Sequence, residues 1–289
     1  ICKWKNQTNV NLIELDYTDF RPIDDLINKI QPDEIYNFAA LTSGKGMYSN
    51  VHEIYQINAI FVSYILESIR LSNNNIKFFQ SSSREVFGIQ DKFPQNEKSN
   101  YAPRSPYGAA KLFSQNITKI YRDYHNLYSI SGILYNHESP RRGDEFVSKK
   151  IIRAAVRIKL KIQDTLILGN LEASRDWGYA CDFIEAIWLI MQNTVPKDYI
   201  IATGKEYSVR DFCHEAFSCL GINYKDYVKI DKNFDRKNDD RAHFVGDISQ
   251  IFKDTGWKPK TEFKQLVQEM VSAEMHSIEK DRGILTKKY

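Results

Sequence analysis

Short apolar segments alternate with longer amphipathic segments along this chain of 289 residues. This alternation is typical of a parallel sheet whose buried strands are covered by helices. Strands are expected at Val10–Leu15, Glu34–Ala39, Lys77–Ser82, Ser129–Tyr135 and Tyr199–Thr203. Helices are expected at Phe20–Lys29, Val51–Leu71, Pro106–Tyr124, Phe146–Lys159 and Asp182–Gln192. The sequence therefore predicts an α/β fold with a doubly wound parallel sheet.

Composition narrows the class of protein. Forty basic and 37 acidic residues leave a net charge of +3, which is too balanced to indicate nucleic-acid binding. The four cysteines show no C-x-x-C spacing, so we expect no metal site, and we expect them to remain reduced. The N-terminus lacks an apolar signal region, and no apolar run approaches the ~18 residues of a membrane helix. We therefore expect a cytoplasmic protein without a membrane partner.

One expected motif is missing from the front of the chain. A doubly wound nucleotide-binding fold normally opens with a strand, a glycine-rich turn and a helix that hold a pyrophosphate. No G-x-G-x-x-G or G-x-x-G-x-x-G pattern occurs, and Gly44-Lys45-Gly46 is too short. Val10–Leu15 already ends in Asp16-Tyr17-Thr18-Asp19, which is expected after the third strand of such a fold. A βαβ unit takes roughly 30 or more residues, and we expect that the first one is missing from the front of this chain, either lost or not included in the sequence.

Tyr107 and Lys111 carry the clearest chemical signal. Their i,i+4 spacing places a phenol and an ammonium on one helical face. Ser105 and Pro106 are typical of the cap and first position of that helix. A free tyrosine titrates near ~10, and a nearby cation favours its phenolate. The pair is thus expected to act as a base, with Lys111 lowering the pKa of Tyr107.

Several further motifs surround this pair. They are Ser81-Ser82-Ser83-Arg84-Glu85, Asn136–Gly143 (N-H-E-S-P-R-R-G), Leu168–Leu171, Arg175–Gly178, Ile201–Gly204 and Gly256–Pro259. Together with Ile30–Asn37 they resemble the extended short-chain dehydrogenase/reductase superfamily and, within it, the GDP-mannose 4,6-dehydratase family. The resemblance runs from about Val10 to about Met275. It implies a Rossmann-type fold, with a partial dinucleotide-binding domain at 1–142 and a mainly nucleotide-sugar-binding region at 143–289.

The resemblance also implies an activity and its catalytic residues. The family converts GDP-mannose to GDP-4-keto-6-deoxymannose by oxidation at C4, loss of water across C5 and C6, and return of hydride to C6. Ser83 matches the family's catalytic threonine, and Glu85 its catalytic glutamate. Tyr107 and Lys111 match its tyrosine and lysine. Glu85 is the residue that separates elimination from hydride exchange alone.

Binding residues follow from the same resemblance, which implies NADP as cofactor, with NAD as the alternative, and a GDP-sugar as substrate. Cofactor contacts are expected at Asp16, Tyr17, Phe38, Ala39, Ala40, Leu41, Thr42, Tyr107, Lys111, His137 and Arg142. Substrate contacts are expected at Asn136, Asn170, Arg175 and Arg236. The resemblance further implies a homodimer or homotetramer.

Other functions remain open at this point. The same chemistry could act on a GDP-heptose or another nucleotide sugar. A reductase or epimerase of the same superfamily is disfavoured by Glu85. A protein of another class, a remnant that only binds a sugar nucleotide or only oligomerises, is supported by the missing glycine-rich turn, whose backbone donors bind pyrophosphate.

Overall fold

The computed structural model describes residues 9–42, 48, 50–73, 75–231, 233 and 243–281. Its main sheet has parallel strands in the order β1-β2-β3-β8. They span Glu34–Asn37, Lys77–Ser83, Ser129–Leu134 and Tyr199–Ile201. Every residue of β3 is buried, as expected for a strand that is covered on both faces. The expected parallel α/β sheet is confirmed.

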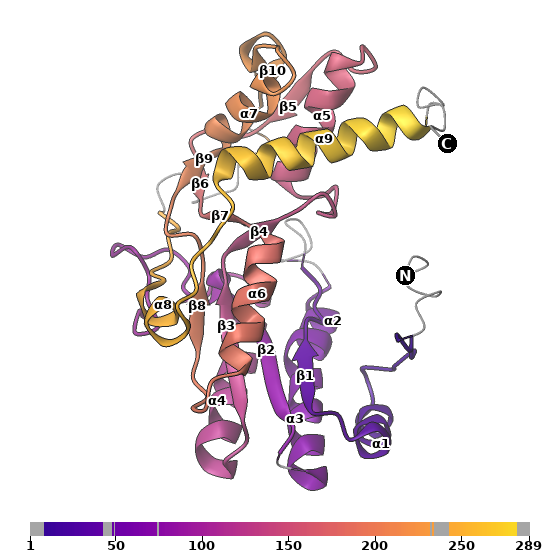
Figure 1. The fold of residues 1–289 in the computed structure, drawn as a ribbon, viewed down its shortest axis with the longest axis vertical. Helices are drawn as coiled ribbons and strands as arrows, with labels where there is room; N and C mark the ends of the chain where they lie inside the picture. Colours follow the sequence, from indigo (N-terminus) through magenta and orange to yellow (C-terminus); the bar gives the residue numbers. More distant parts are fainter. Residues whose placement is uncertain are drawn as a thin grey trace.

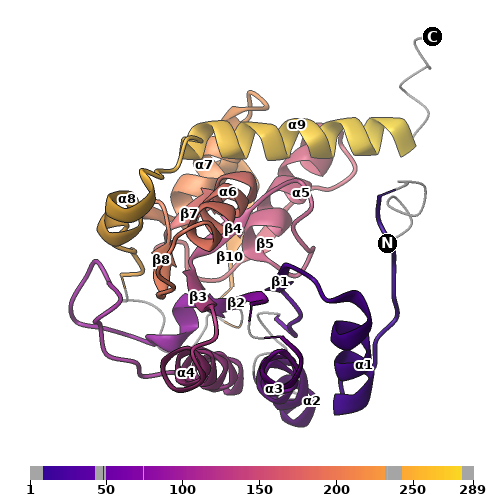
Figure 2. The same cartoon turned by 60° about the horizontal axis from the view of Figure 1, so that its bottom comes forward.

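Helices cover both faces of this sheet (Figure 2). α3 and α4 lie against one face, and α6 lies against the other. The bounds of the helices in this half are Phe20–Ile30 for α1, Val51–Tyr55 for α2, Phe61–Ser72 for α3, Pro106–His125 for α4, Ala180–Met191 for α6 and Ser249–Thr255 for α8. Within the described ranges, no helix is both long and apolar enough to cross a membrane.

The start of α4 is set by local sequence. The Ser105 side chain accepts a hydrogen bond of 3.0 Å from the Gly108 amide, and Pro106 occupies the first turn, where its missing N–H costs nothing. Gly108 is required because a Cβ there would lie 2.9 Å from the Glu85 carbonyl oxygen. The first turn of α4 therefore sits directly against the end of β2.

A second group of elements lies beyond the carboxyl ends of the sheet strands (Figure 1). Its helices are α5 (Val147–Lys159), α7 (Val209–Ser218) and α9 (Phe263–Asp281), which pack around Trp177 and Phe212. Three strand pairs join it: β4 with β7 (Asn136–Glu138, Trp177–Tyr179), β5 with β10 (Leu166–Leu168, Val228–Ile230) and β6 with β9 (Ser174–Arg175, Tyr207–Ser208). The β4–β7 pair begins just after β3, so it lies next to the edge where the sheet strands end.

The expected strand at Val10–Leu15 is wrong. This segment has no regular structure, and its apolar side chains Val10, Leu12 and Ile13 are exposed. A strand needs a neighbouring ladder for its backbone donors and acceptors. The described sheet ends at β1 on this side, and the segment forms no ladder with it. The apolar pattern of Val10–Leu15 was therefore not enough to form a strand without a neighbouring strand to pair with.

The expected single helix at Val51–Leu71 is interrupted. A π-helical turn at Gln56–Ile60 separates α2 from α3. Asn58 lies in this turn and is fully buried. Its side chain accepts a bond of 2.8 Å from the Leu41 amide and donates one of 3.0 Å to the Leu41 carbonyl. The π turn thus fixes the loop that follows β1, consistent with the frequent occurrence of such turns at functional sites.

Candidate active site

The candidate site lies where the carboxyl ends of β1 and β2 meet the first turn of α4. Tyr107 is buried in this turn, and its phenol is hydrogen-bonded to the side chains of Thr42, after β1, and Ser83, at the end of β2. Two separate segments, the loop after β1 and the end of β2, therefore direct hydroxyl groups at the phenolic oxygen that α4 carries. The structure brings together Ser83 and Tyr107 as the sequence predicted.

The pKa of Tyr107 is raised, which differs from the expectation. Burial is the largest cause, and the negative charge of Glu85 adds to it. The hydrogen bonds from Thr42 and Ser83 and the charge of Arg142 act in the opposite direction. Lys111 is not among the main causes of this shift, and the net shift is opposite to the lowering that the spacing predicted.

The Lys111 ammonium is bound by Ser81 at the end of β2. The ammonium donates a hydrogen bond of 2.8 Å to the Ser81 carbonyl and lies 3.4 Å from the Ser81 hydroxyl. The same nitrogen is 5.8 Å from the centre of the Tyr107 ring. No carboxylate in the described part of the chain pairs with it. Burial therefore lowers the pKa of Lys111 to about 8.

Replacing Lys111 with methionine should change how stability depends on pH. The folded-state pKa of about 8 lies below the ordinary 10.5, so between these values the unfolded chain binds more protons than the folded chain. The free energy of unfolding of the wild type should therefore rise relative to Lys111→Met across this range, by about 3 kcal/mol in total.

Denaturant titrations of both proteins from about pH 8 to about pH 10.5 measure this difference. Lys119→Met, on the exposed face of the same helix, is the matched control and should show no such trend. A wild type that loses stability relative to Lys111→Met as pH rises contradicts the burial of a protonated ammonium.

Glu85 follows Ser83 by two residues, in a 3-10 turn at Arg84–Val86. The Glu85 amide lies 3.3 Å from the Ser83 hydroxyl, to which it donates a hydrogen bond. The Glu85 carboxylate forms an ion pair with Arg84 through its Oε1 atom. The Glu85 backbone abuts the first turn of α4, since a Cβ at Gly108 would lie 2.9 Å from the Glu85 carbonyl oxygen. The catalytic set expected from the sequence is therefore gathered at one edge of the sheet.

The loop after β1 supplies the remaining neighbours of Tyr107. Phe38 packs its ring 5.7 Å from that of Phe79, and the Ala39 amide donates a hydrogen bond of 3.1 Å to Asn37. Leu41 is held by Asn58, and Thr42 reaches Tyr107. The segment Phe38–Thr42, expected to contact a cofactor, thus borders the site.

Asp16 and Tyr17 lie in a separate turn. Asp16 accepts hydrogen bonds from the Thr18 amide, at 2.8 Å, and the Thr18 hydroxyl, at 2.6 Å. Tyr17 donates a bond of 3.3 Å to Glu53 in α2. The structure does not bring either residue into contact with Tyr107, Ser83 or Glu85 through a described interaction.

His137 and Arg142 approach the site from β4. The Nδ1 atom of His137 lies 2.8 Å from the Tyr135 carbonyl, and burial lowers the pKa of His137, with a further contribution from the charges of Arg142 and Lys111. The Nε atom of Arg142 lies 3.2 Å from the Glu138 carboxylate, and its guanidinium lies over the Phe146 ring at 3.5 Å. The guanidinium of Arg142 is thus held in place by Glu138 and Phe146, and its charge acts on the Tyr107 phenol.

The expected substrate residues are more dispersed. Asn136 belongs to β4 and is paired in register with Trp177. Asn170 accepts a hydrogen bond of 2.8 Å from the Glu172 amide. Arg175 donates one of 2.6 Å to the Ser174 carbonyl, and its guanidinium lies 4.8 Å from the centre of the Phe244 ring. Arg236 lies outside the described residues.

Sequence reasoning missed three residues that shape this site. Asn58 holds the Leu41 backbone, Ser81 binds the Lys111 ammonium, and Arg84 pairs with Glu85. Asn58 had no distinctive sequence signal, since the same segment carries other polar residues such as Gln56 and Ser63. The Lys111–Ser81 contact depends on the alignment of β2 with α4, which no local pattern reveals. Arg84 and Glu85 are neighbours in the sequence and pair within the 3-10 turn after β2.

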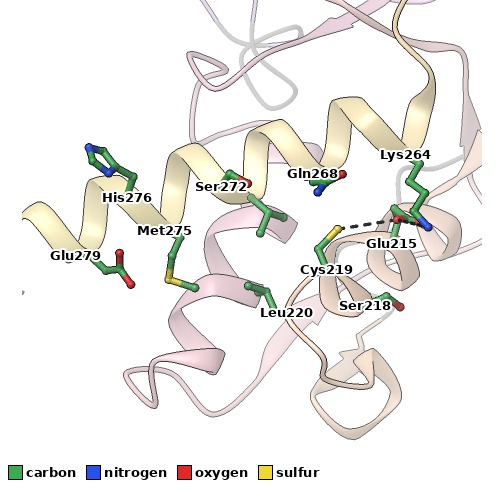
Figure 3. A pocket seen from close by; sticks show the side chains of 11 residues that line it. Glu215, Ser218, Cys219, Leu220, Lys264, Gln268, Ser272, Met275, His276 and Glu279 are labelled. Carbon is green, nitrogen blue, oxygen red and sulfur yellow. Dashed lines mark hydrogen bonds and ion pairs between the residues drawn. The ribbon is translucent and has the colours of Figure 1, made fainter. Parts of the chain in front are cut away.

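A hollow of about 500 Å³ lies elsewhere, between α7 and α9 (Figure 3). In it, Glu215 is 3.9 Å from both the Cys219 sulfur and the Lys264 ammonium. None of the expected site residues lines this hollow. It is therefore separate from the Tyr107 site.

Comparisons with known proteins give the relatives of this chain. The model of the family described as "GDP-mannose 4,6 dehydratase" matches residues 2–270. The chain is similar to GDP-mannose 4,6 dehydratase 1 of Arabidopsis thaliana, at 39% identity over 283 residues, covering 95% of this chain and 78% of the relative.

Two solved structures share the fold. One is RMD from Pseudomonas aeruginosa complexed with NADPH, with a TM-score of 0.83, 21% identity, and coverage of 92% of this chain and 87% of that chain. The other is dTDP-glucose 4,6-dehydratase from Bacillus anthracis in complex with NAD, with a TM-score of 0.81, 22% identity, and coverage of 96% and 83%.

Proposed function

This chain belongs to the GDP-mannose 4,6-dehydratase family, and on that premise we propose that the Tyr107 site performs an internal redox elimination on GDP-mannose. The enzyme class is that of a hydro-lyase, which removes water from its substrate. The observation that carries the proposal for the site is the convergence of Ser83 and Tyr107, with Glu85 close enough to act on the phenol. A hydride-exchange enzyme needs the first two groups but not the carboxylate.

A nicotinamide dinucleotide fits the residues at this edge. The buried Lys111 ammonium has no carboxylate partner among the described residues and retains donor capacity for a hydroxyl-rich ligand. Phe38–Thr42 and His137 are the proposed contacts of the cofactor near Lys111. Asp16 and Tyr17 are the proposed contacts of its adenine end. When bound, the cofactor supplies a reversible hydride acceptor next to the phenol.

We propose NADP for this role, as implied by family membership. Proteins of the same fold are described with NADPH in one case and with NAD in another, so the fold admits both. Mass spectrometry of the nucleotide released from the purified full-length protein would distinguish the two.

Tyr107 carries out the first proton transfer. As the phenolate, Tyr107 accepts the proton of the C4 hydroxyl while hydride leaves C4, and becomes a neutral phenol. Ser83, whose hydroxyl is hydrogen-bonded to Tyr107, would hold the C4 oxygen in place. Because burial raises the pKa of Tyr107, the phenolate needs positive charge nearby at this step, and Arg142 already acts in that direction. The product of this step is a 4-ketone that acidifies the C5 hydrogen.

Glu85 carries out the elimination. Its carboxylate removes the proton at C5 and passes a proton to the departing C6 hydroxyl, which leaves as water. Oxidation at C4 is balanced by reduction at C6, so the overall change is the loss of one water molecule. Without an acid–base group at this position, the ketone would have no route to the 5,6-alkene.

The GDP group of the substrate carries a negatively charged diphosphate, which cationic and amide side chains can bind. Arg142 and Arg175 carry planar guanidinium groups that suit bidentate phosphate contacts, and Asn136 and Asn170 offer amides beside them. Arg236 is a further proposed contact in the part of the chain outside the described residues.

We also propose that the protein forms a homodimer or homotetramer. Apolar side chains Phe113, Ile120 and Tyr124 are exposed along one side of α4, spaced so that they share a helical face. A second copy of the chain would cover this stripe. Light scattering that gives the mass of a monomer at micromolar concentration would contradict the assembly.

Product analysis tests the function directly. Full-length protein incubated with GDP-mannose should yield a nucleotide sugar lighter by the mass of one water. Recovery of unchanged GDP-mannose, or of an isomer of the same mass, would contradict the assignment. A GDP-heptose offered in parallel shows how strictly the site selects the hexose.

A further inference from the structure

We propose that Arg84 is a positioning residue for Glu85 in the elimination step, an inference that rests on the proposed function. Arg84 lies between Ser83 and Glu85 in the 3-10 turn after β2. Its side chain is 7% exposed, and the Glu85 side chain is 21% exposed. Because the Arg84 side chain is buried, its guanidinium stays next to the Glu85 carboxylate and does not extend into solvent.

The ion pair uses one carboxylate oxygen only. Arg84 contacts Oε1 of Glu85. No hydrogen bond from a described residue reaches Oε2, so that atom is available for the C5 hydrogen and the C6 hydroxyl. Anchoring one oxygen fixes the direction of the other. This is the arrangement that a proton-transferring carboxylate needs, because its free oxygen must be held within hydrogen-bond reach of the reacting atoms.

The ring of Phe244 supports the Arg84 guanidinium. The guanidinium lies over the ring of Phe244 at 3.7 Å from the centre. Phe244 is 2% exposed, and its carbonyl accepts a hydrogen bond of 3.1 Å from the Asp176 amide. Planar guanidinium groups stack well on aromatic faces. Phe244 therefore limits the guanidinium to a position facing Glu85.

The pair is not explained by stability alone. The Nη1 atom of Arg84 is buried and has no hydrogen-bond partner among the described residues. An unsatisfied buried donor lowers stability, and a charge pair of this kind is often no better than apolar packing. A role in the reaction gives a reason for its presence beside Glu85.

Arg84→Met tests this role, because methionine keeps an unbranched side chain that suits a buried position but removes the guanidinium and its charge. In full-length protein we expect the elimination rate to fall by about 10- to 100-fold, as a misplaced catalytic group does. Oxidation at C4 and the KM for GDP-mannose should stay near the wild-type values. A 4-keto sugar nucleotide that retains its C6 hydroxyl should then accumulate in chemically quenched mixtures, where mass spectrometry detects it.

Arg84→Lys should recover part of the lost elimination rate, since it restores the charge without the planar guanidinium. Phe244→Leu provides a second route if Arg84→Met does not fold, and should give a smaller loss with the same accumulation of the 4-keto hexose. The matched control is Arg153→Met on α5, which breaks an exposed ion pair between Arg153 and Asp144. This variant should behave as wild type.

The outcomes separate this inference from the proposed function. A wild-type protein that forms no dehydrated product overturns the function itself. A wild type that dehydrates GDP-mannose, with an Arg84→Met variant that does so equally fast or loses both steps in parallel, overturns only the positioning role of Arg84.

Discussion

Tyr107→Phe in the full-length protein should lower the rate of product formation from GDP-mannose by about 10²- to 10⁴-fold, the usual contribution of general acid–base catalysis. The substitution removes one oxygen, and the ring keeps its packing at the start of α4. Ser83 and Thr42 lose the phenol as their hydrogen-bond partner. The C4 hydroxyl then has no group that can accept its proton.

Stability and rate must be measured together for this variant. Thermal unfolding should change little, because only a hydroxyl is lost. Tyr121→Phe is a matched control on the same helix: it removes a phenol that donates a hydrogen bond of 2.7 Å to Glu67, away from the site. Wild-type turnover by Tyr107→Phe excludes the assignment of Tyr107 as the base.

Glu85→Gln should block elimination more strongly than oxidation at C4. Glutamine has the shape of glutamate but cannot take the C5 proton, so we expect a loss of about 10²- to 10⁴-fold in the elimination step. In deuterated water, the wild type should place solvent deuterium at C5 of the product. The variant should do so at a correspondingly lower rate, which NMR of the sugar measures.

Glu185→Gln is the control for this measurement, since Glu185 pairs with Lys260 on the exposed side of α6. It should leave both steps unchanged. Deuterium entry at C5 at the wild-type rate in Glu85→Gln would count against the carboxylate as the base.

The start of α4 and the strands of the main sheet were predictable from local sequence. The Ser105–Pro106 signal marks the first turn, and α4 begins at Pro106 as expected. β2 extends one residue beyond the predicted end, to Ser83. These elements depend on helix caps, apolar periodicity and turn residues, and each of these signals comes from residues that are close in sequence.

Features that depend on distant partners were not predictable. Val10–Leu15 has the pattern of a strand but no ladder to join. Lys111 was expected to act on Tyr107, yet its ammonium binds the Ser81 carbonyl, which is 30 residues away in sequence. The position of the Arg84 guanidinium depends on Phe244, which is 160 residues away in sequence and is brought beside it by the fold.

Transfer of a label from C4 to C6 is the most direct test of an internal redox elimination at the Tyr107 site. GDP-mannose carrying deuterium at C4 would be converted by the full-length protein in ordinary water, and the product examined by NMR. We expect the deuterium at C6 of the 4-keto-6-deoxy sugar. A product with deuterium still at C4, or with none at C6, would contradict the proposed chemistry.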